Sequence, residues 1–270
     1  MNDLFRIDYP SQPLEHSYQI GLVMTTYNRP DYLERCLASL AQSRLEQTLL
    51  LLVDDASDDL RTLEMIRAFN PPTIPVLKAF RLQKEGCAMY ENLRYGWDLL
   101  REQYHCTYLT NLDPDTIVRK EWLSKIHALY EQQQVNGPLI VTGFNAHQHP
   151  ILATSQQYYH KKSLGGLHLF FDVSLYEQIV RPSLVGIDWD WRVVAAMEKE
   201  KYRILCTRPS VIQHIGREGF WSGKHGVYDF AIDYWGSSRL VTIPIELYFR
   251  GRRRLGSWQS RLQERFSEHS

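Results

Sequence analysis

Paired carboxylates follow two of the apolar runs in this chain. Asp-Asp at 54–55 ends the run 49–53, and Asp-Pro-Asp at 113–115 ends the run 107–112. The two acids of Asp-Pro-Asp share a face, because side chains two apart along an extended segment point the same way. Clustered carboxylates repel one another, so a divalent cation or the hydroxyls of a ribose should lie among them. Carboxylate oxygens suit hard cations such as Mg²⁺ or Mn²⁺, which can bridge to a diphosphate.

Each acidic pair also has an ordinary explanation in local structure. Asp-Pro-Asp is common turn chemistry. The stretch from Asp54 to Asp58 contains Asp and Ser residues that favour a helix N-cap. At 54–55, one acid can cap a helix while the other faces a ligand. The position of both pairs, each at the end of a buried strand, favours a ligand site.

The apolar pattern predicts strands that alternate with helices over the first half of the chain. The run 49–53 is continuously apolar, as in a strand buried on both faces of a parallel sheet. Leu33, Cys36, Leu37 and Leu40 recur at helical spacing. We expect strands at 19–25, 49–53, 76–82, 107–112 and 138–144, and helices at 31–43, 59–69, 87–103 and 120–133. This alternation indicates βαβ units and an α/β fold with an open, mostly parallel sheet, in which ligands bind beyond the carboxyl ends of the strands.

The pattern loosens after residue 144. We expect a long polar loop at 147–163, strands at 167–171 and 202–206, and helices at 173–180 and 188–201. The polar residues and prolines of 1–17 indicate an N-terminal arm. The predicted organisation is this arm, one domain over 18–216 with halves 18–144 and 145–216, and a C-terminal extension over 217–270.

Composition and charge exclude several classes of protein. The 270 residues contain 31 Lys and Arg against 31 Asp and Glu, and this balance argues against a general nucleic-acid binder. No GxxxxGKS or GxxxxGKT motif occurs and no GxGxxG follows a strand, which disfavours an ATPase, a kinase or an NAD enzyme. The four cysteines form no CxxC pair. Because the sequence has neither an apolar leader nor a run of about 20 apolar residues, we expect a cytoplasmic protein.

Three motifs, taken in order, carry a resemblance to a known family. Thr-Tyr-Asn-Arg-Pro at 26–30, Val-Asp-Asp-Ala-Ser-Asp at 53–58 and Asp-Pro-Asp at 113–115 lie within 18–216. Their order and spacing resemble those of the inverting nucleotide-sugar glycosyltransferases of family two, which have the GT-A fold. The resemblance implies a Rossmann-like sheet flanked by helices, a nucleoside-diphosphate sugar as donor, and Mn²⁺ or Mg²⁺ as cofactor.

The resemblance also implies roles for residues of the donor half. Thr25 and Tyr27 would line the base pocket, and Asp54 or Asp55 would bind the nucleobase or the ribose. Glu91 stands where an arginine is common in the family. The implied nucleotide-sugar-binding residues are Thr25, Tyr27, Arg29, Asp54, Asp55, Gly86, Asn92 and Asp113. The implied metal ligands are Asp113, Asp115 and His214, with Asp115 on the metal and Asp113 nearer the ribose.

The second half supplies the implied catalytic and acceptor-binding residues. Asp188, in Gly-Ile-Asp-Trp-Asp-Trp at 186–191, resembles the general base of the family. Such a carboxylate removes the proton of the acceptor hydroxyl while the anomeric carbon is attacked from the face opposite the diphosphate. Acids at 188 and 190 are also what a helix dipole favours in a first turn. The implied acceptor-binding residues are Gly165, Gly166, Trp189 and Asp190. Trp191 is expected in the core, because large aromatic side chains are mostly buried.

Three features of the C-terminal part allow more than one interpretation. His214, at the end of an expected strand, can be a metal ligand, since neutral imidazole suits Mn²⁺, or a structural histidine. The glycine-rich stretch 222–226 can fold over a diphosphate as a lid. The basic and aromatic segment 250–266 can contact the inner face of an anionic membrane, or can pack on the domain.

The predicted activity is inverting transfer of a single sugar to a hydroxyl of a glycan or a lipid-linked oligosaccharide, in cell-surface polysaccharide synthesis. UDP-hexose is the default donor because UDP is the commonest nucleotide in the family, and dTDP-rhamnose is next. Two other hypotheses stay open. One is a sugar-nucleotide nucleotidyltransferase, which normally carries a glycine- and arginine-rich loop that 25–30 is not. The other is a non-catalytic nucleotide- or sugar-binding module on the same fold.

Overall fold

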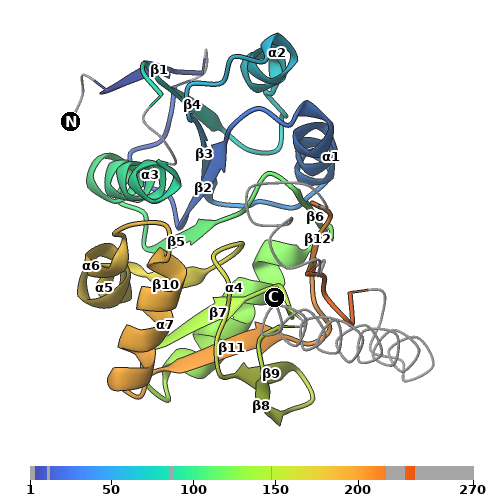
Figure 1. Cartoon of the computed structure of the whole chain (residues 1–270), viewed down its shortest axis with the longest axis vertical. Helices are drawn as coiled ribbons and strands as arrows, with labels where there is room; N and C mark the ends of the chain where they lie inside the picture. Colours follow the sequence, from blue (N-terminus) through green and yellow to red (C-terminus); the bar gives the residue numbers. More distant parts are fainter. Residues whose placement is uncertain (1–3, 11–12, 85–87, 147, 217–228, 235–270) are drawn as a thin grey trace, which may run out of the picture.

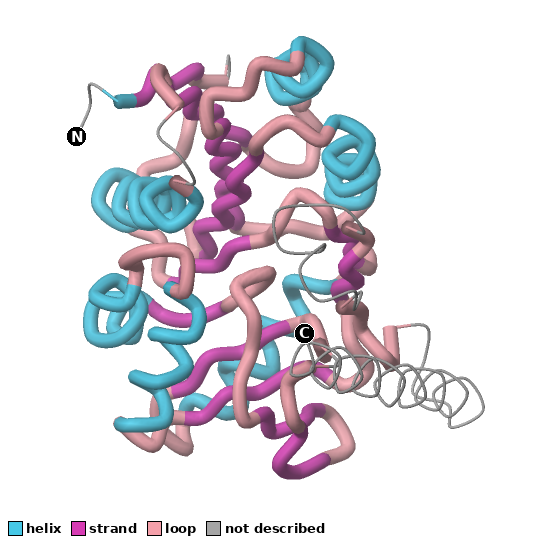
Figure 2. The backbone as a smooth tube through the Cα atoms, in the orientation of Figure 1, coloured by secondary structure: helices cyan, strands magenta, loops and turns pink. Residues whose placement is uncertain are grey.

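Helices cover both faces of one large sheet (Figure 1). A computed structural model of the chain describes residues 4–10, 13–84, 88–146, 148–216 and 229–234. Within these residues, ten strands form one sheet in the order β1-β4-β3-β2-β5-β10-β7-β11-β9-β8, and two short strands form a second sheet, β12-β6. The tube view separates this central run of strands from the helices that flank it (Figure 2).

The bounds of the elements are as follows. The large sheet contains β1 (Phe5–Asp8), β2 (Ile20–Thr26), β3 (Thr48–Asp54), β4 (Val76–Arg81), β5 (Tyr108–Asn111), β7 (Leu139–Thr142), β8 (Ile151–Thr154), β9 (Tyr158–Lys161), β10 (Phe170–Asp172) and β11 (Arg203–Thr207). The small sheet pairs β6 (Thr116–Val118) with β12 (Ile212–His214). The helices are α1 (Pro30–Ala41), α2 (Leu60–Ala68), α3 (Met89–Tyr104), α4 (Trp122–Gln134), α5 (Val173–Leu175), the π turn η2 (Tyr176–Val180), α6 (Arg181–Ser183) and α7 (Trp189–Lys199). Among the described helices, none combines the length and the apolar character needed to cross a bilayer.

The two acidic pairs lie at the carboxyl ends of β3 and β5, which belong to a group of four neighbouring parallel strands. β4, β3, β2 and β5 are neighbours in that order, and each neighbouring pair is parallel. Every residue of β3 is buried, as the continuous apolar run predicts. The carboxyl ends of these strands therefore meet at one edge, at Thr26, Asp54, Arg81 and Asn111. The predicted α/β fold with an open sheet is confirmed.

The second half of the chain continues the same sheet in mixed directions. β10 is antiparallel to both β5 and β7, and β11 is parallel to β7. Phe170 of β10 pairs with Thr110 on one side and with Val141 on the other. β10 therefore joins the two halves directly and brings the segment before it to the acidic edge.

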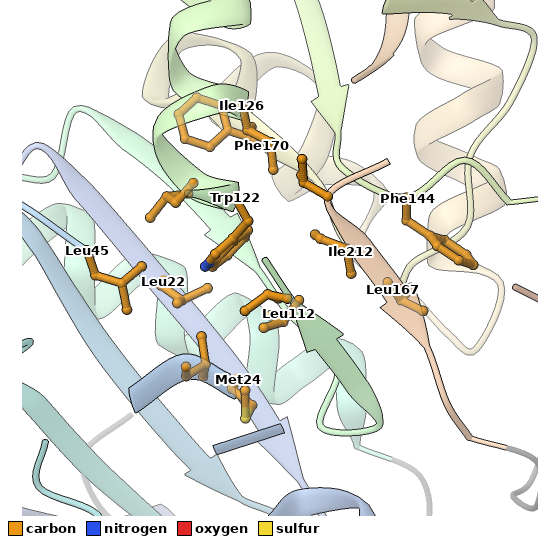
Figure 3. Close-up of a cluster of buried hydrophobic side chains, with 14 of the residues drawn as sticks. Leu22, Met24, Leu45, Leu112, Trp122, Ile126, Phe144, Leu167, Phe170 and Ile212 are labelled. Carbon is orange, nitrogen blue, oxygen red and sulfur yellow. The ribbon is translucent and has the colours of Figure 1, made fainter. Parts of the chain in front are cut away.

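Two apolar layers, one on each face, hold the helices to the sheet. One layer contains the buried sides of α1, α2 and α4, and the other contains those of α3, η2 and α7. Figure 3 shows Trp122 of α4 within the first layer, with Leu22 and Phe170 around it. In the second layer, Trp97 of α3 and Trp189 of α7 pack edge to face, with ring centroids 6.3 Å apart.

Short strands lie where the sequence indicated an arm and a loop. β1 falls inside the expected arm at 1–17, pairs with β4, and stacks Phe5 on Tyr95 with ring centroids 3.9 Å apart. β8 and β9 form a hairpin inside the expected loop at 147–163. All four residues of β8 are exposed, so this strand lacks the apolar alternation that would reveal it. The loop expectation was therefore wrong, whereas the domain boundaries stay predictions.

His168 is a fully buried titratable group between β5 and β7. The amide of Gly143 donates to its Nδ1 (3.3 Å), so the ring proton sits on Nε2, 3.2 Å from Thr110 Oγ1. The Thr110 hydroxyl in turn donates to the carbonyl of Leu169 (2.7 Å). Burial lowers the pKa of His168 to about 3. The folded chain therefore keeps this ring neutral well into acid.

We predict that His168 makes the fold lose stability as the pH falls. The unfolded ring takes up a proton below its ordinary pKa of about 6.5, whereas the folded ring does not, so each pH unit below that value costs up to about 1.4 kcal/mol. Urea unfolding of the wild type and of His168→Gln, at about pH 7.5 and about pH 5, measures the difference. The wild type should lose about 2 kcal/mol more than the variant over this range. Equal losses would contradict the prediction.

Candidate active site

The loops that follow β2 and β3 are tied together at the carboxyl edge of the sheet. Asn28 adopts a left-handed conformation (φ 50°), donates from Nδ2 to Asp58 (2.7 Å) and accepts from the amide of Asp59 (3.0 Å). Its own amide donates to Ser57 Oγ (2.8 Å). Arg29 follows with φ 61°, and α1 begins at the next residue. This network determines where the Arg29 side chain and the first acidic pair lie.

The two acids after β3 have different tasks. Asp54 accepts from the hydroxyl (2.6 Å) and the amide (3.0 Å) of Ser57, and so closes the turn before α2. Burial raises the pKa of Asp54, and the bonds from Ser57 partly offset this rise. Asp55 instead accepts from Nδ2 of Asn92 (2.9 Å) and pairs with the ammonium of Lys84. One acid therefore closes a turn while the other faces the site. The N-cap expected within 54–58 lies one residue later, because the Asp59 side chain accepts from the amide of Thr62 at the start of α2.

A polar cluster lies beyond β2 and β3 and is here called the Tyr27 corner. It consists of Tyr27, Asp55, Lys84 and Asn92. Lys84 Nζ lies 3.5 Å from the centroid of the Tyr27 ring, a cation–π contact. Tyr27 remains 42% exposed, whereas Thr25 is buried within β2. An exposed aromatic ring can stack on a nucleobase, and the carboxylate beside it can accept from ribose hydroxyls. The amide of Asn92 is fully buried and positions that carboxylate.

Sequence reasoning missed two basic residues here, Lys84 and Arg81. The Arg81 side chain is almost fully buried and donates to Asn92 Oδ1 (2.9 Å) and to Glu91 Oε2 (2.9 Å). Asn92 is therefore held between Arg81 and Asp55. Glu91 stands where an arginine is common in the family. Arg81, at the end of β4, brings a guanidinium to this part of α3 and pairs with Glu91. No local pattern marks these two residues, because the stretch 82–88 contains one lysine and one glutamate.

Asp115, Arg29 and His214 form a charged cluster at the same edge. Asp115 Oδ2 lies 2.9 Å from Arg29 Nη1 and 3.3 Å from His214 Nε2. Burial opposes ionisation of Asp115, but these two contacts outweigh it and lower the pKa of Asp115. Burial also opposes charge on His214, but Asp115 outweighs it and raises the pKa of the ring. Burial, reinforced by the charge of Asp115, raises the pKa of Asp113 well above its ordinary value.

The donor set at Asp115 fits a divalent cation. His214 Nδ1 lies 2.8 Å from the carbonyl oxygen of Asp229, which can only accept, so Nδ1 carries a proton. In the neutral ring, the Nε2 lone pair then faces a carboxylate oxygen, and two acceptors at this distance need a proton or a cation between them. A Cβ at Gly216 would lie 2.1 Å from Asp115 Oδ2, so glycine keeps this space open. Among the described residues, no group of three or more His, Cys, Asp or Glu side chains is arranged to hold a metal, so Asp113 does not complete the expected ligand set.

Hydrogen bonds connect β5 with the start of α7 through a glycine. Asn111 accepts from the amide of Leu169 (2.9 Å) and donates from Nδ2 to the carbonyl of Gly166 (2.7 Å). The amide of Gly166 donates to Asp190 Oδ2 (2.9 Å). A Cβ at Gly166 would lie 2.7 Å from Cζ2 of Trp189. Glycine here lets α7 approach the acidic edge, and sequence reasoning named this glycine but missed Asn111.

The two acids at the start of α7 have different surroundings. The side chain of Asp188, the expected base, is 54% exposed and pairs with Arg192 (3.1 Å). Asp190 is half-buried, and burial raises its pKa although the amides of Gly166 and Trp191 partly offset this rise. The charge of Asp190 also acts on Asp113 and raises its pKa further. Asp190 therefore belongs to the carboxylates of the edge, whereas Asp188 is paired at the surface.

The two tryptophans of this segment have the reverse of the expected exposures to solvent. Trp189 is fully buried, and Trp191 is 57% exposed. Residues two apart on a helix are rotated by about 200°, so one of the pair faces the core when the other faces out. The Trp191 ring lies 5.7 Å, centroid to centroid, from that of His149, which is buried and contacts Ser163 Oγ (2.8 Å). Burial lowers the pKa of His149 to about 4, so a neutral imidazole lies beside the exposed indole of Trp191.

Several expected features lie outside the described residues. They are Gly86, the glycine-rich stretch 222–226 and the basic segment 250–266. Of the C-terminal extension expected over 217–270, residues 229–234 are described. The roles suggested for the other features stay predictions.

A family model matches slightly more than half of the chain, including both acidic pairs. Residues 22–164 match the family described as Glycosyl transferase family 2. The chain belongs to this family. The resemblance found in the motifs is therefore confirmed for the region that carries both acidic pairs. Asp190 and His214 lie beyond the matched residues, so their place in the site depends on the structure.

Solved structures of Staphylococcus aureus TarS, residues 1–349, share the fold. The first has 14% identity, covers 69% of this chain and 57% of the TarS chain, and gives a TM-score of 0.50. A complex with UDP covers the same shares at 14% identity and a TM-score of 0.51. A complex with UDP-GlcNAc has 15% identity, covers 78% and 61%, and gives a TM-score of 0.55. This chain therefore spans less than two thirds of the length of the TarS chains. No curated protein matches it.

We predict that Gly166→Ala destabilises the fold more than Gly165→Ala does. The new methyl group at 166 would lie 2.7 Å from the buried Trp189, whereas at 165 the nearest atom is His149 Nε2 at 3.3 Å. Overpacking of this kind costs about 1–3 kcal/mol, which corresponds to a fall in Tm of roughly 2–10 °C for a chain of this size. Thermal unfolding of the two variants beside the wild type measures the difference. An equal or smaller loss at 166 would mean that α7 does not depend on close approach there.

Proposed function

We propose that this protein transfers a single sugar from a nucleoside-diphosphate sugar to a hydroxyl group, with inversion at the anomeric carbon. One observation carries the proposal: the Tyr27 corner, the Asp115–His214 pair and the Asp190 carboxylate lie at one edge of the sheet. In that order, they suit a nucleoside, a diphosphate with its cation, and an acceptor hydroxyl. Membership of Glycosyl transferase family 2 supports this reading.

UDP-hexose is the proposed donor, with dTDP-rhamnose as the next candidate. The TarS structures of the same fold include complexes with UDP and with UDP-GlcNAc, which supports a uridine nucleotide. The ring of Tyr27 would stack on the base, and Asp55 would accept from the base or the ribose. Arg29 would contact the diphosphate, since a guanidinium matches phosphate oxygens in a bidentate geometry. Asp113 would hydrogen-bond the ribose.

The proposed reaction is a single in-line displacement. The acceptor oxygen forms a bond to the anomeric carbon, the bond from that carbon to the diphosphate oxygen breaks, and the electron pair leaves with the diphosphate. Asp190 takes the proton of the acceptor hydroxyl. We favour Asp190 over the expected Asp188 because it neighbours the Asp-Pro-Asp segment, whereas Asp188 pairs with Arg192. The raised pKa of Asp190 strengthens it as a base.

Asp115 and His214 would hold Mn²⁺ or Mg²⁺. When bound, the cation neutralises charge on the departing diphosphate. An imidazole ligand favours Mn²⁺ over Mg²⁺.

A glycan or a lipid-linked oligosaccharide is the proposed acceptor. Trp191 is an exposed indole next to Asp190 in the chain, and aromatic faces of this kind suit the apolar face of a sugar ring. Gly165 and Gly166 would let the acceptor approach the backbone. We extend the proposal to cell-surface polysaccharide synthesis in the cytoplasm, with the basic segment 250–266 in contact with the inner face of the membrane.

Nucleotide binding tests the donor half. UDP with Mn²⁺, at about 100 times its Kd, should stabilise the chain by roughly 2.7 kcal/mol, a rise in Tm of about 5–10 °C. GDP, dTDP and CMP serve as comparisons, and EDTA should remove most of the UDP shift. Asp115→Ala should lose the part that depends on Mn²⁺ and keep the part seen in EDTA. The absence of a shift for any nucleotide would favour a non-catalytic module, and a shift with nucleoside triphosphates alone would favour a nucleotidyltransferase.

Paired substitutions at the start of α7 test the base. We expect Asp190→Asn to slow the release of UDP from UDP-hexose by about 10²–10⁴-fold, as loss of a general base does. Asp188→Asn is the matched control and should change the rate less than about threefold, since its carboxylate is exposed and paired with Arg192. Both variants should bind UDP as the wild type does. The reverse ranking of the two variants would return the role to Asp188.

A further inference from the structure

Residues 229–234 form a largely buried segment, here called the strap, beside His214. Phe230, Ala231, Asp233 and Tyr234 are all buried. Ala231 forms a β-bridge with Ala146, next to the end of β7. The strap belongs to neither sheet, and the proposed reaction gives it no task.

Two long side chains hold the strap to the small sheet. Gln213 of β12 accepts from the amide of Ala231 (2.7 Å) and donates to its carbonyl (3.3 Å), as a neighbouring strand would. Arg119, which follows β6, donates to the carbonyl of Tyr234, and its guanidinium lies 4.9 Å from the centroid of the Tyr234 ring. The strap therefore has a defined place next to the strand that ends in His214.

Asp233 provides the third anchor. Its side chain accepts from the hydroxyls of Ser210, just before β12, and of Tyr159 in β9 (3.0 Å). Asp233 is only 1% exposed, and a buried carboxylate is costly unless donors such as these satisfy it. This acid therefore locks the strap to β9 and to the approach to β12 at the same time.

A backbone atom of the strap contacts His214. The carbonyl of Asp229 accepts from Nδ1 of His214 (2.8 Å), and Nε2 faces Asp115 (3.3 Å). A histidine that binds a metal through one ring nitrogen usually donates from the other to a carbonyl or a carboxylate, which fixes the tautomer and the orientation of the ring. The Asp229 carbonyl is in that place.

We propose that the strap is a positioning element that directs Nε2 of His214 toward Asp115, and that Asp233 is the residue that holds it there. This inference rests on the proposed function, because it assigns His214 to the cation of the donor. Asp233 acts through the strap and touches neither substrate nor cation. Loss of the hydrogen-bond partner of a metal-binding histidine, which is the Asp229 carbonyl here, typically weakens metal binding by about 10- to 100-fold.

The test combines one spectroscopic and one binding measurement on the full chain. Histidine-selective ¹⁵N NMR, without metal or nucleotide, should show a slowly exchanging Nδ1 proton of His214, assigned by its loss in His214→Gln. The ratio of the UDP Kd in EDTA to the UDP Kd in Mn²⁺ reports the contribution of the cation. Asp233→Ala should lose the proton signal and reduce this ratio by about 10- to 100-fold. Tyr159→Phe, which leaves Ser210 on Asp233, should give a smaller change of the same kind.

A core variant far from the strap separates positioning from simple loss of stability. Ile66→Ala removes a fully buried side chain of α2, which costs about 2–5 kcal/mol, and should keep both the proton signal and the ratio. Retention of the Nδ1 signal in Asp233→Ala would overturn the proposal, and so would loss of that signal with an unchanged ratio. A wild-type ratio of one would instead overturn the cation role in the proposed function, while the proton signal would still decide whether the strap holds the ring.

Discussion

Buried carboxylates of like charge must be compensated, and this requirement organises one edge of the sheet. Asp115 and Asp190 act on Asp113 there and add to the rise in its pKa that burial causes, and burial also raises the pKa of Asp190. Arg29 and His214 supply the positive charge that keeps Asp115 ionised. A chain that keeps such a cluster is ready to take up a cation with a polyanionic ligand, which is the chemistry that we propose.

The rest of the fold serves to bring these groups together from distant parts of the sequence. Parallel strands place the end of β5 beside the ends of β2 and β3, and β10 attaches the second half directly to β5. Asn111 and Gly166 then carry the contact to Asp190 at the start of α7. On the other side, the strap and β12 bring His214 to Asp115. The site is thus completed by β10, α7 and β12, none of which belongs to the four parallel strands β4, β3, β2 and β5.

The sequence predicted those parts of the site that depend on local pattern. Acids after apolar runs, in a chain that alternates strands and helices, place Asp55 and Asp115 at the carboxyl edge without any tertiary information. The sequence favoured Asp188 as the base, whereas our proposal of Asp190 depends on the surroundings of the two acids in the fold. Local pattern does not show these surroundings, because two residues at the start of a helix differ by about 200° in direction. Lys84 and the β8–β9 hairpin escaped notice for a related reason. Their positions depend on contacts with Asp55 and β11, which no local pattern reveals.

We propose that Asp115 and His214 together hold the cation that accompanies a nucleoside diphosphate. The decisive measurement is a crystal structure of the full chain with UDP and Mn²⁺, with data collected at the manganese absorption edge. We expect an anomalous peak in contact with Asp115 Oδ2, His214 Nε2 and the diphosphate, with the uracil against Tyr27. Bound UDP without such a peak, or with manganese away from both side chains, would show that Asp115 and His214 do not hold the cation.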